Sequence, residues 1–347
     1  MKVCVYGGGH IAHSIVAAIT QVQDVNVVTR RPLQWQSRVD ALQNGLLVAG
    51  KHNVVPTSLA SSCAEADVVF IALPQFAFEE AIMAVEPIAH AGQTFCFVPA
   101  PSKSALYSER LIAKGADVVA FQRVPFIART IEYGKSVSIS SPRAELALMV
   151  SSQKLEEDWN AKCRMWFGCG ARYLSSFLVA AFSNSNPLLH PARLVELFKD
   201  WDGSAYSHAP LFYADWTDES SRLYIDADRE MERVMRHFPV IDMGKDYESV
   251  LDHYGVSGVS ELTQKIRSIP AFKTIKSPMR EVDGGWLPNL GSRYFTEDVP
   301  FGTKTIQGYA RQVNIETPVI DYLVRTVEGI TKVVGSISGY RKGGSEL

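Results

Sequence analysis

His190 is the residue of this sequence whose type and position first suggest chemistry. It lies in the stretch NPLLHPARLVELF (186–198), directly before a proline that is predicted to open an apolar helix. Histidine can move protons near neutral pH because its ordinary pKa is about 6.5. Pro191 favours the first helical position, which would make His190 the N-cap, where the helix dipole disfavours the protonated ring. A capping or merely packed histidine is the simpler alternative.

The glycine-rich start of the chain has the spacing of a nucleotide site. The β-rich run KVCVY leads into Gly7, Gly9 and Ala12 of a G-x-G-x-x-A motif, and a helical pattern follows. In dinucleotide-binding folds the first glycine allows a tight turn, the second admits a pyrophosphate, and the alanine keeps helix and strand close. Backbone N–H groups at the helix start, around His10 and Ile11, would bind the phosphates. A glycine-rich turn without a ligand is the alternative.

The end of the next predicted strand, VNVVT, bears on the kind of dinucleotide. NAD-specific folds place an acidic residue near this point to accept hydrogen bonds from the ribose hydroxyls. This chain has Thr29, Arg30 and Arg31 there instead. Guanidinium groups suit a 2′-phosphate, so NADP is the expected cofactor and NAD the less favoured one. Two solvated surface arginines are the alternative.

The elements that must position these residues alternate in the first half of the chain. Apolar strands are predicted in ADVVFIALP (66–74), QTFCFVPAP (93–101) and ADVVAFQRVPF, with helices between them. This alternation is typical of a doubly wound parallel sheet, the Rossmann type. Ligands bind beyond the carboxyl ends of such strands, so Leu73, Pro74 and Pro99 are expected near the cofactor. Strand termination by proline would also explain both loops.

Helices are expected to replace strands after about residue 145. AELALMVSSQKL and LSSFLVAAFSNS are predicted helices, and DESSRLYIDADREMERVMRHF is a longer one that Thr217 could cap. The sequence therefore predicts an α/β chain with two domains and a tail. A dinucleotide-binding domain is expected over 1–175, an all-helical substrate domain over 176–340 and a flexible tail over 341–347.

The composition excludes several classes of protein. The 347 residues carry 35 basic and 37 acidic side chains, with no basic run, so a nucleic-acid partner is not expected. Five cysteines without a CxxC pair indicate a reduced cytoplasmic protein with neither a disulfide framework nor a metal site. The most apolar helix, LSSFLVAAF, is about half as long as a membrane span. No membrane association is expected.

Two segments, SNSNPLLHP (183–191) and RYFTEDVPFG (293–302), resemble the octopine/nopaline (opine) dehydrogenase family. The order of glycine motif, NPxxHP, RY-x-TEDVPFG and TPVID (317–321) is also similar, so the resemblance covers essentially the whole chain. It implies an NAD(P)-dependent, reversible reaction. The amine of an amino acid condenses with a 2-oxo acid, and a nicotinamide hydride reduces the imine to a secondary-amine dicarboxylate.

The resemblance also implies roles for single residues. His190 and Asp298 match the catalytic His–Asp pair of the family, and Arg293 matches a position that binds a substrate carboxylate. Asn186 would lie near the nicotinamide and the substrate. Structural alternatives exist for each: Asp298 could be a turn residue, Arg293 could pair with Glu297 or Asp298, and Asn186 could cap or end a helix.

Two other functions stay open. A 2-oxo acid reductase of the ketopantoate type shares this fold, but it uses a helical lysine that the segment 174–184 lacks. A non-catalytic NADP-sensing protein is the second alternative. The amino acid, the oxo acid and the oligomeric state are not determined, a homodimer being one candidate. Several aromatic or imidazole side chains could shape an amine pocket or simply pack: Trp201, Tyr206, His208, Tyr213 and Trp216.

Overall fold

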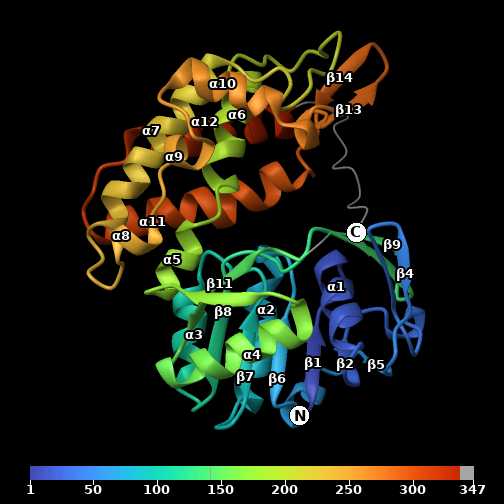
Figure 1. Ribbon diagram of the computed structural model, residues 1–347. Helices are drawn as coiled ribbons and strands as arrows, with labels where there is room; N and C mark the ends of the chain where they lie inside the picture. The colour runs from blue at the N-terminus through green and yellow to red at the C-terminus, as the bar shows by residue number, and fades with distance from the viewer. Residues whose placement is uncertain (141, 337–347) are drawn as a thin grey trace. The chain divides into compact units, whose positions relative to one another are not determined.

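The computed structural model describes residues 1–140 and 142–336, and the chain forms two compact units that divide between Asn184 and Ser185 (Figure 1). Helix α5 (Phe177–Phe182), which was expected in the second domain, packs in the first unit against α3 (Ser104–Ile112). The tail predicted for 341–347 lies outside the described residues.

The first unit is built on an eight-stranded sheet, six strands of which are parallel. These are β1 (Val3–Tyr6), β2 (Val25–Val28), β5 (Val54–Thr57), β6 (Val68–Ile71), β7 (Thr94–Phe97) and β8 (Asp117–Phe121). They lie in the order β5-β2-β1-β6-β7-β8, which is the Rossmann order, so the predicted fold class is confirmed. The order in which successive strands are added to the sheet reverses between β1 and β6, and such sheets bind ligands at this kind of position.

Two further strands extend this sheet beyond β8. Strand β11 (Glu145–Val150) pairs antiparallel with β8, and β12 (Gly170–Tyr173) pairs parallel with β11. The helix predicted in AELALMVSSQKL was therefore wrong. Leu146, Leu148 and Val150 are buried while their neighbours are more exposed, which is the period of a strand. Pairing with β8 overrides the helix propensity of Leu, Ala and Met.

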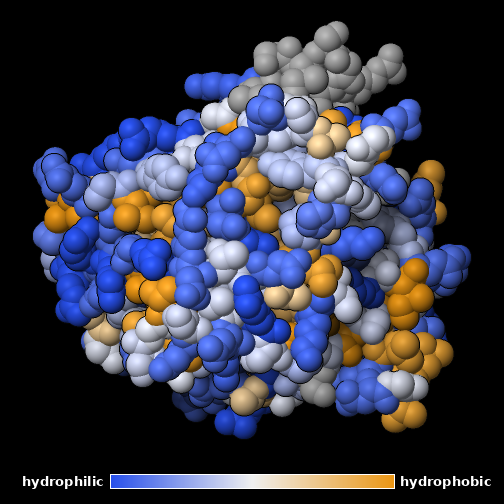
Figure 2. Space-filling view, turned by 90° about the horizontal axis from the view of Figure 1, so that it is seen from above, coloured by the Kyte–Doolittle hydropathy of each residue, from blue (hydrophilic) through white to orange (hydrophobic). Residues whose placement is uncertain are grey.

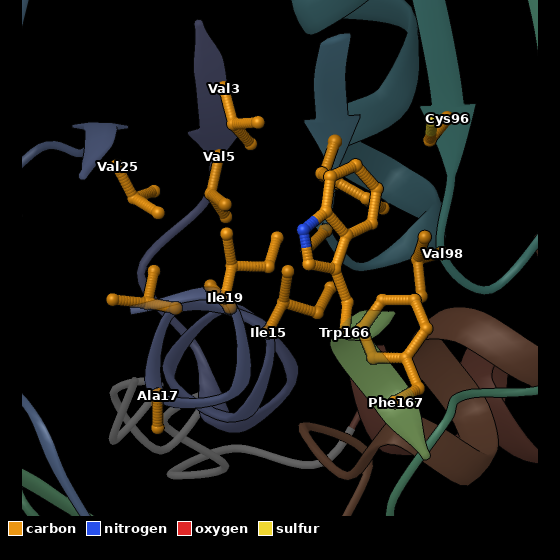
Figure 3. Close-up of a cluster of buried hydrophobic side chains, with 14 of the residues drawn as sticks. Val3, Val5, Ile15, Ala17, Ile19, Val25, Cys96, Val98, Trp166 and Phe167 are labelled. Carbon is orange, nitrogen blue, oxygen red and sulfur yellow. The ribbon is translucent and has the colours of Figure 1, made fainter. Parts of the chain in front are cut away.

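Helices cover both faces of the sheet. On one face, α1 (His10–Ile19) and α4 (Glu156–Phe167) enclose an apolar cluster (Figure 3). On the other face, α2 (Gln75–Val85) and α3 bring Phe78 and Tyr107 against Phe97 of β7. Because both faces are buried, strands β1, β2, β6, β7 and β8 are almost continuously apolar, which is why they could be recognised in the sequence. The edge strand β5 is partly exposed and was not predicted.

A smaller sheet completes the first unit, in the order β4-β3-β10-β9. Its strands are β3 (Asp40–Gln43), β4 (Leu46–Val48), β9 (Ala128–Glu132) and β10 (Ser136–Ile139). Strands β9 and β10 pack against α1, so their turn lies over the helix that follows the glycine motif. Short 3₁₀ helices occur at η1 (Pro32–Gln34), η2 (Ala60–Glu65), η3 (Glu86–Ile88) and η4 (Gln153–Leu155).

The second unit is helical, as predicted, with one β-hairpin in addition. Its helices are α6 (Asn186–Phe198), α7 (Asp218–Met235), α8 (Met243–Asp246), α9 (Val250–Tyr254), α10 (Val259–Ser268), η5 (Pro270–Phe272), the π-helix η6 (Tyr294–Thr303), α11 (Lys304–Gln312) and α12 (Pro318–Ser336). The hairpin pairs β13 (Met279–Val282) with β14 (Gly285–Pro288). Helix α6 packs against α7, α12 and η6, and Thr217 caps α7 as expected.

The outer surface is mixed in character. On the face seen in Figure 2, hydrophilic and hydrophobic residues are interspersed. Among the described residues, no helix combines the length and the apolar character that crossing a membrane requires.

Candidate active site

His190 lies inside helix α6 rather than at its start. The helix begins at Asn186, with Ser185 at the N-cap and Pro187 in the first turn, while Pro191 stands within the helix. The prediction that Pro191 opens the helix and that His190 caps it was therefore wrong. Pro187 already occupies the early position that favours proline. His190 is one turn further along, so the dipole at the helix start acts on it less strongly.

Pro191 has a different consequence from the one expected. A proline inside a helix has no N–H to donate to the carbonyl four residues earlier, here that of Pro187. The hydroxyl of Thr303, at the end of η6, donates to that carbonyl at 2.6 Å instead. Gly302 allows this approach, because a Cβ at this position would lie 2.5 Å from Cγ of Pro187. The proline after the histidine thus helps to fasten η6 to α6.

This fastening brings a carboxylate to the histidine. Nδ1 of His190 lies 2.7 Å from Oδ2 of Asp298, which is on η6. Both residues are only 8% exposed. The short contact places the ring proton on Nδ1, facing the carboxylate, and leaves Nε2 for exchange of a proton. The structure therefore brings together the two residues that the family resemblance paired.

Nε2 of His190 faces a tyrosine. The hydroxyl of Tyr213 lies 2.9 Å away, and the Tyr294 ring packs on the imidazole at a centroid distance of 4.4 Å. Burial raises the pKa of Tyr213 above its usual range, so this hydroxyl stays neutral and can donate to Nε2. The sequence had marked Tyr213 only as one of several pocket candidates. It stands 23 residues from His190, and no motif connects the two.

Arg293 and Asn186 belong to the same two elements as this pair, Arg293 at the start of η6 and Asn186 at the start of α6. Nε of Arg293 donates to the buried carboxylate of Glu297, so the expected structural ion pair is present. The Arg293 side chain is nevertheless 75% exposed, and its guanidinium can still meet an anion. Asn186 is exposed and stands four residues before His190, which places both on the same side of α6.

The first unit holds a cradle of the kind a dinucleotide needs. Gly7 has a positive φ of 152°, and a Cβ there would lie 2.3 Å from the carbonyl oxygen of Ala72. At Gly9 a Cβ would meet no atom within 4 Å, so the backbone before α1 is open to a ligand. Ala12 is fully buried against the sheet. The tight turn, the open glycine and the N-terminus of the helix together form a backbone arrangement that can bind a pyrophosphate.

Neighbouring loops and the small sheet surround this cradle. Leu73 and Pro74 follow β6, and Pro99 follows β7, so these positions share the carboxyl edge with the glycine motif. At the start of α1, Nδ1 of His10 accepts a hydrogen bond from the backbone N–H of Thr130 on β9. Ile11 is partly buried against the apolar cluster.

The residues expected to determine the preference between NADP and NAD lie at the end of β2. The hydroxyls of Thr29 and Tyr133 lie 3.0 Å apart, and the Arg31 guanidinium lies over the Tyr133 ring at 5.5 Å. Arg30 and Arg31 are both exposed. Tyr133 comes from the turn between β9 and β10, about a hundred residues later, so local sequence patterns could not reveal it.

Within the described residues, no group of three or more His, Cys, Asp or Glu side chains is placed to hold a metal ion. All five cysteines are free and buried.

The first unit combines a Rossmann-type sheet with an open glycine turn, and the helical unit contains a buried histidine–carboxylate pair. These features are typical of nicotinamide-nucleotide-dependent dehydrogenases with separate cofactor and substrate domains. Residues 173–331 match the family of the NAD/NADP octopine/nopaline dehydrogenase, alpha-helical domain. This match confirms the family resemblance for the helical half of the chain.

Known proteins are similar over nearly the whole chain. Octopine dehydrogenase of Pecten maximus is 24% identical over 93% of this chain and 88% of its own length. A structure of octopine dehydrogenase in complex with NADH and agmatine has a TM-score of 0.82, with 24% identity over 95% of this chain and 90% of that one. A ketopantoate reductase of the PanE/ApbA family from Ralstonia eutropha JMP134 is less similar, with a TM-score of 0.64 and 14% identity over 96% and 99% of the two chains.

Proposed function

We propose that this chain is an opine dehydrogenase, an NAD(P)-dependent oxidoreductase acting on a CH–NH bond. It condenses an amino acid, or another amine, with a 2-oxo acid and reduces the product to a secondary-amine dicarboxylate, in a reversible reaction. The observation that carries this proposal is the buried His190–Asp298 pair within a helical domain of the matching family.

In this proposal His190 handles the proton of the condensation. Attack of the amine on the oxo acid gives a carbinolamine. The protonated ring supplies a proton to the hydroxyl group, the C–O bond breaks, and water leaves as the nitrogen lone pair forms the C=N bond of a protonated imine, which takes the positive charge and accepts the hydride. Asp298 stabilises the imidazolium and holds its orientation through Nδ1. The bound dinucleotide supplies the hydride for reduction. In the opposite direction neutral His190 takes the proton back.

Arg293 and Asn186 would orient the substrates. A guanidinium can hold a carboxylate through two parallel hydrogen bonds, and the exposed Arg293 side chain is suited to the carboxylate of the oxo acid. Glu297 would keep the Nε side of this guanidinium fixed while the other N–H groups receive the substrate. The Asn186 amide, one turn before His190, would contact the substrate or the nicotinamide.

NADP is the proposed cofactor. The two exposed arginines after β2 and the adjacent Thr29 support it, since guanidinium groups suit a 2′-phosphate. The family as described includes both NAD and NADP enzymes, and the similar octopine dehydrogenase was solved with NADH. We propose the cytoplasm as the compartment on the grounds of five free cysteines, and a homodimer as the assembly to be tested.

A ketopantoate-type reductase is the second candidate, because a protein of that kind shares the fold. One observation weighs against it. The lysine nearest to the histidine segment, Lys199, directly follows α6 and is paired with Glu219 on α7.

The proposal is tested by following NADPH consumption with pyruvate, 2-oxoglutarate and glyoxylate, each combined with the twenty amino acids. We expect consumption that requires both substrates, and a secondary amine as the product in mass spectrometry. Consumption with the oxo acid alone, giving a hydroxy acid, would identify a reductase. NADPH binding without any turnover would favour a non-catalytic sensor.

A further inference from the structure

Both ring nitrogens of His190 are already engaged. Nδ1 contacts Asp298 and Nε2 contacts the Tyr213 hydroxyl, and the imidazole is almost fully buried. The nitrogen that would exchange a proton with a substrate therefore faces a phenol. A substrate atom could reach Nε2 directly only if Tyr213 moved away.

Packing holds Tyr213 in place. Its ring stacks on Phe272 at a centroid distance of 4.2 Å with 19° between the planes, and also on Trp216 at 6.1 Å and 15°. Phe212 closes a third side at 4.8 Å, and Tyr213 is only 5% exposed. Swinging this side chain out would break several aromatic contacts at once. The hydroxyl is therefore a fixed part of the site.

The Tyr213 hydroxyl also has a neighbour beyond His190. This neighbour is Tyr294, whose ring packs on the His190 imidazole at a centroid distance of 4.4 Å and whose side chain is only partly buried. A hydroxyl can donate and accept at the same time. When His190 is neutral, Tyr213 donates to Nε2; when His190 is protonated, Nε2–H donates to Tyr213, which turns its own proton outward. The direction of the hydrogen bonds reverses with the charge of the ring.

From this geometry we propose that Tyr213 is a catalytic residue that relays the proton between Nε2 of His190 and the reacting substrate. The proposal rests on the opine dehydrogenase function. In the dehydration step the Nε2 proton moves to the Tyr213 oxygen while the Tyr213 proton moves to the carbinolamine hydroxyl. The C–O bond breaks, water leaves, the nitrogen lone pair forms the C=N bond of a protonated imine that takes the positive charge, and both His190 and Tyr213 end neutral.

Tyr213→Phe tests the relay, because it removes one oxygen atom and keeps the ring between Phe272 and Trp216. We expect kcat to fall at least tenfold, with the KM for NADPH and the melting temperature unchanged. The protonated ring also loses the stronger, charge-assisted hydrogen bond, so the alkaline limb of the pH profile should move down by about one pH unit.

The matched control is Tyr322→Phe, which also removes one hydroxyl from the second unit. Tyr322 lies on α12, its side chain is exposed, and it has no part in the proposed site. Its kcat and pH profile should stay unchanged. Should Tyr213→Phe fold poorly, 3-fluorotyrosine at position 213 keeps the hydroxyl in place with greater acidity, and the pH profile should again shift.

The outcomes distinguish failure of the Tyr213 relay from failure of the opine dehydrogenase function on which it rests. If the unmodified protein forms no secondary amine, the function fails, whatever Tyr213 does. If it forms one and Tyr213→Phe keeps both kcat and the pH profile, the relay is wrong and His190 acts on the substrate directly. A ¹⁵N NMR titration of His190 in both proteins gives a readout without turnover, and an unchanged His190 pKa would likewise overturn the relay.

Discussion

At the scale of single residues, the site depends on which nitrogen of His190 carries the proton. The 2.7 Å contact with Asp298 assigns Nδ1–H to the carboxylate side, so Nε2 is the position at which charge appears and disappears. A carboxylate buried beside a histidine lowers the stability of the fold unless the two groups stabilise each other. The pair is therefore expected to act as a unit, in folding as well as in catalysis.

His190→Gln should lower kcat by roughly 10²–10⁴, the range of general acid–base catalysis. Glutamine suits this position because His190 lies inside α6 and glutamine is a good helix former. Asp298→Asn should also lower kcat. The double variant should lower kcat by a factor much smaller than the product of the two single factors, because the pair acts as a unit. Steady-state kinetics with circular dichroism as a folding control measures this. Retained activity in His190→Gln would exclude the histidine from the chemistry.

The sequence could predict part of this site and not the rest. His190, Asp298 and Arg293 were found because short motifs match a family. An ion pair of Arg293 with Glu297 or Asp298 was named as the structural alternative, and the structure shows the pair with Glu297, four residues away on the same side of the helix. Tyr213 could not be singled out, because its contact with His190 arises only from the packing of a loop against α6.

At the scale of elements, the geometry of the pair is set by the contact between α6 and η6. Three residues make this contact: Pro191 releases the Pro187 carbonyl, Gly302 allows the backbones to approach, and Thr303 donates to the carbonyl. Thr303 is fully buried and its hydroxyl also lies 3.3 Å from the backbone oxygen of Asp298. A π-helix with its wider turn is common at functional sites, and here it carries the carboxylate.

Thr303→Val tests this role of the threonine. Valine has nearly the same shape but no hydroxyl, so the buried Pro187 carbonyl loses its donor, at a cost of about 1–3 kcal/mol. We expect a lower free energy of unfolding in urea, together with a fall in kcat because Asp298 is held less precisely. Thr305→Val is the control, since its hydroxyl donates to the carbonyl four residues earlier in a partly exposed position. An unchanged stability of Thr303→Val would show that the contact is incidental.

Element boundaries show where local sequence patterns mislead. A single proline after His190 was taken as a helix start, although Pro187 stands four residues earlier and fills that role. Strand β11 was mistaken for a helix because leucine, alanine and methionine favour helices, whereas its pairing with β8 is a long-range contact. Five of the six parallel strands were predicted, because burial on both faces makes them almost continuously apolar. The sixth, β5, was missed, since this edge strand is partly exposed and contains Pro56 and Thr57.

At the scale of the whole molecule, the chain separates two tasks. The first unit carries the glycine cradle and the arginines after β2, and the second carries His190, Asp298 and Tyr213. In the proposed function, cofactor recognition and proton transfer therefore depend on different sets of residues. Substitutions in one unit should leave the binding or chemical properties of the other largely intact, which makes the cofactor preference testable by binding alone.

The unmodified protein should bind NADPH more tightly than NADH, because a 2′-phosphate can pair with the guanidinium groups after β2. Arg31→Ala and Arg30→Ala should each raise the Kd for NADPH by roughly ten- to hundredfold, the loss of one charge-assisted hydrogen bond, and change the Kd for NADH little. Arg31 lies over the Tyr133 ring, so its guanidinium is partly oriented already and its loss should cost more. Arg222→Ala, on the exposed side of α7, removes the same charge from the second unit and should affect neither affinity. Isothermal titration calorimetry at fixed ionic strength measures the Kd of each of the four proteins for both dinucleotides. Equal affinities of the unmodified protein for the two dinucleotides would show that these arginines are solvated surface residues and that the chain does not select NADP.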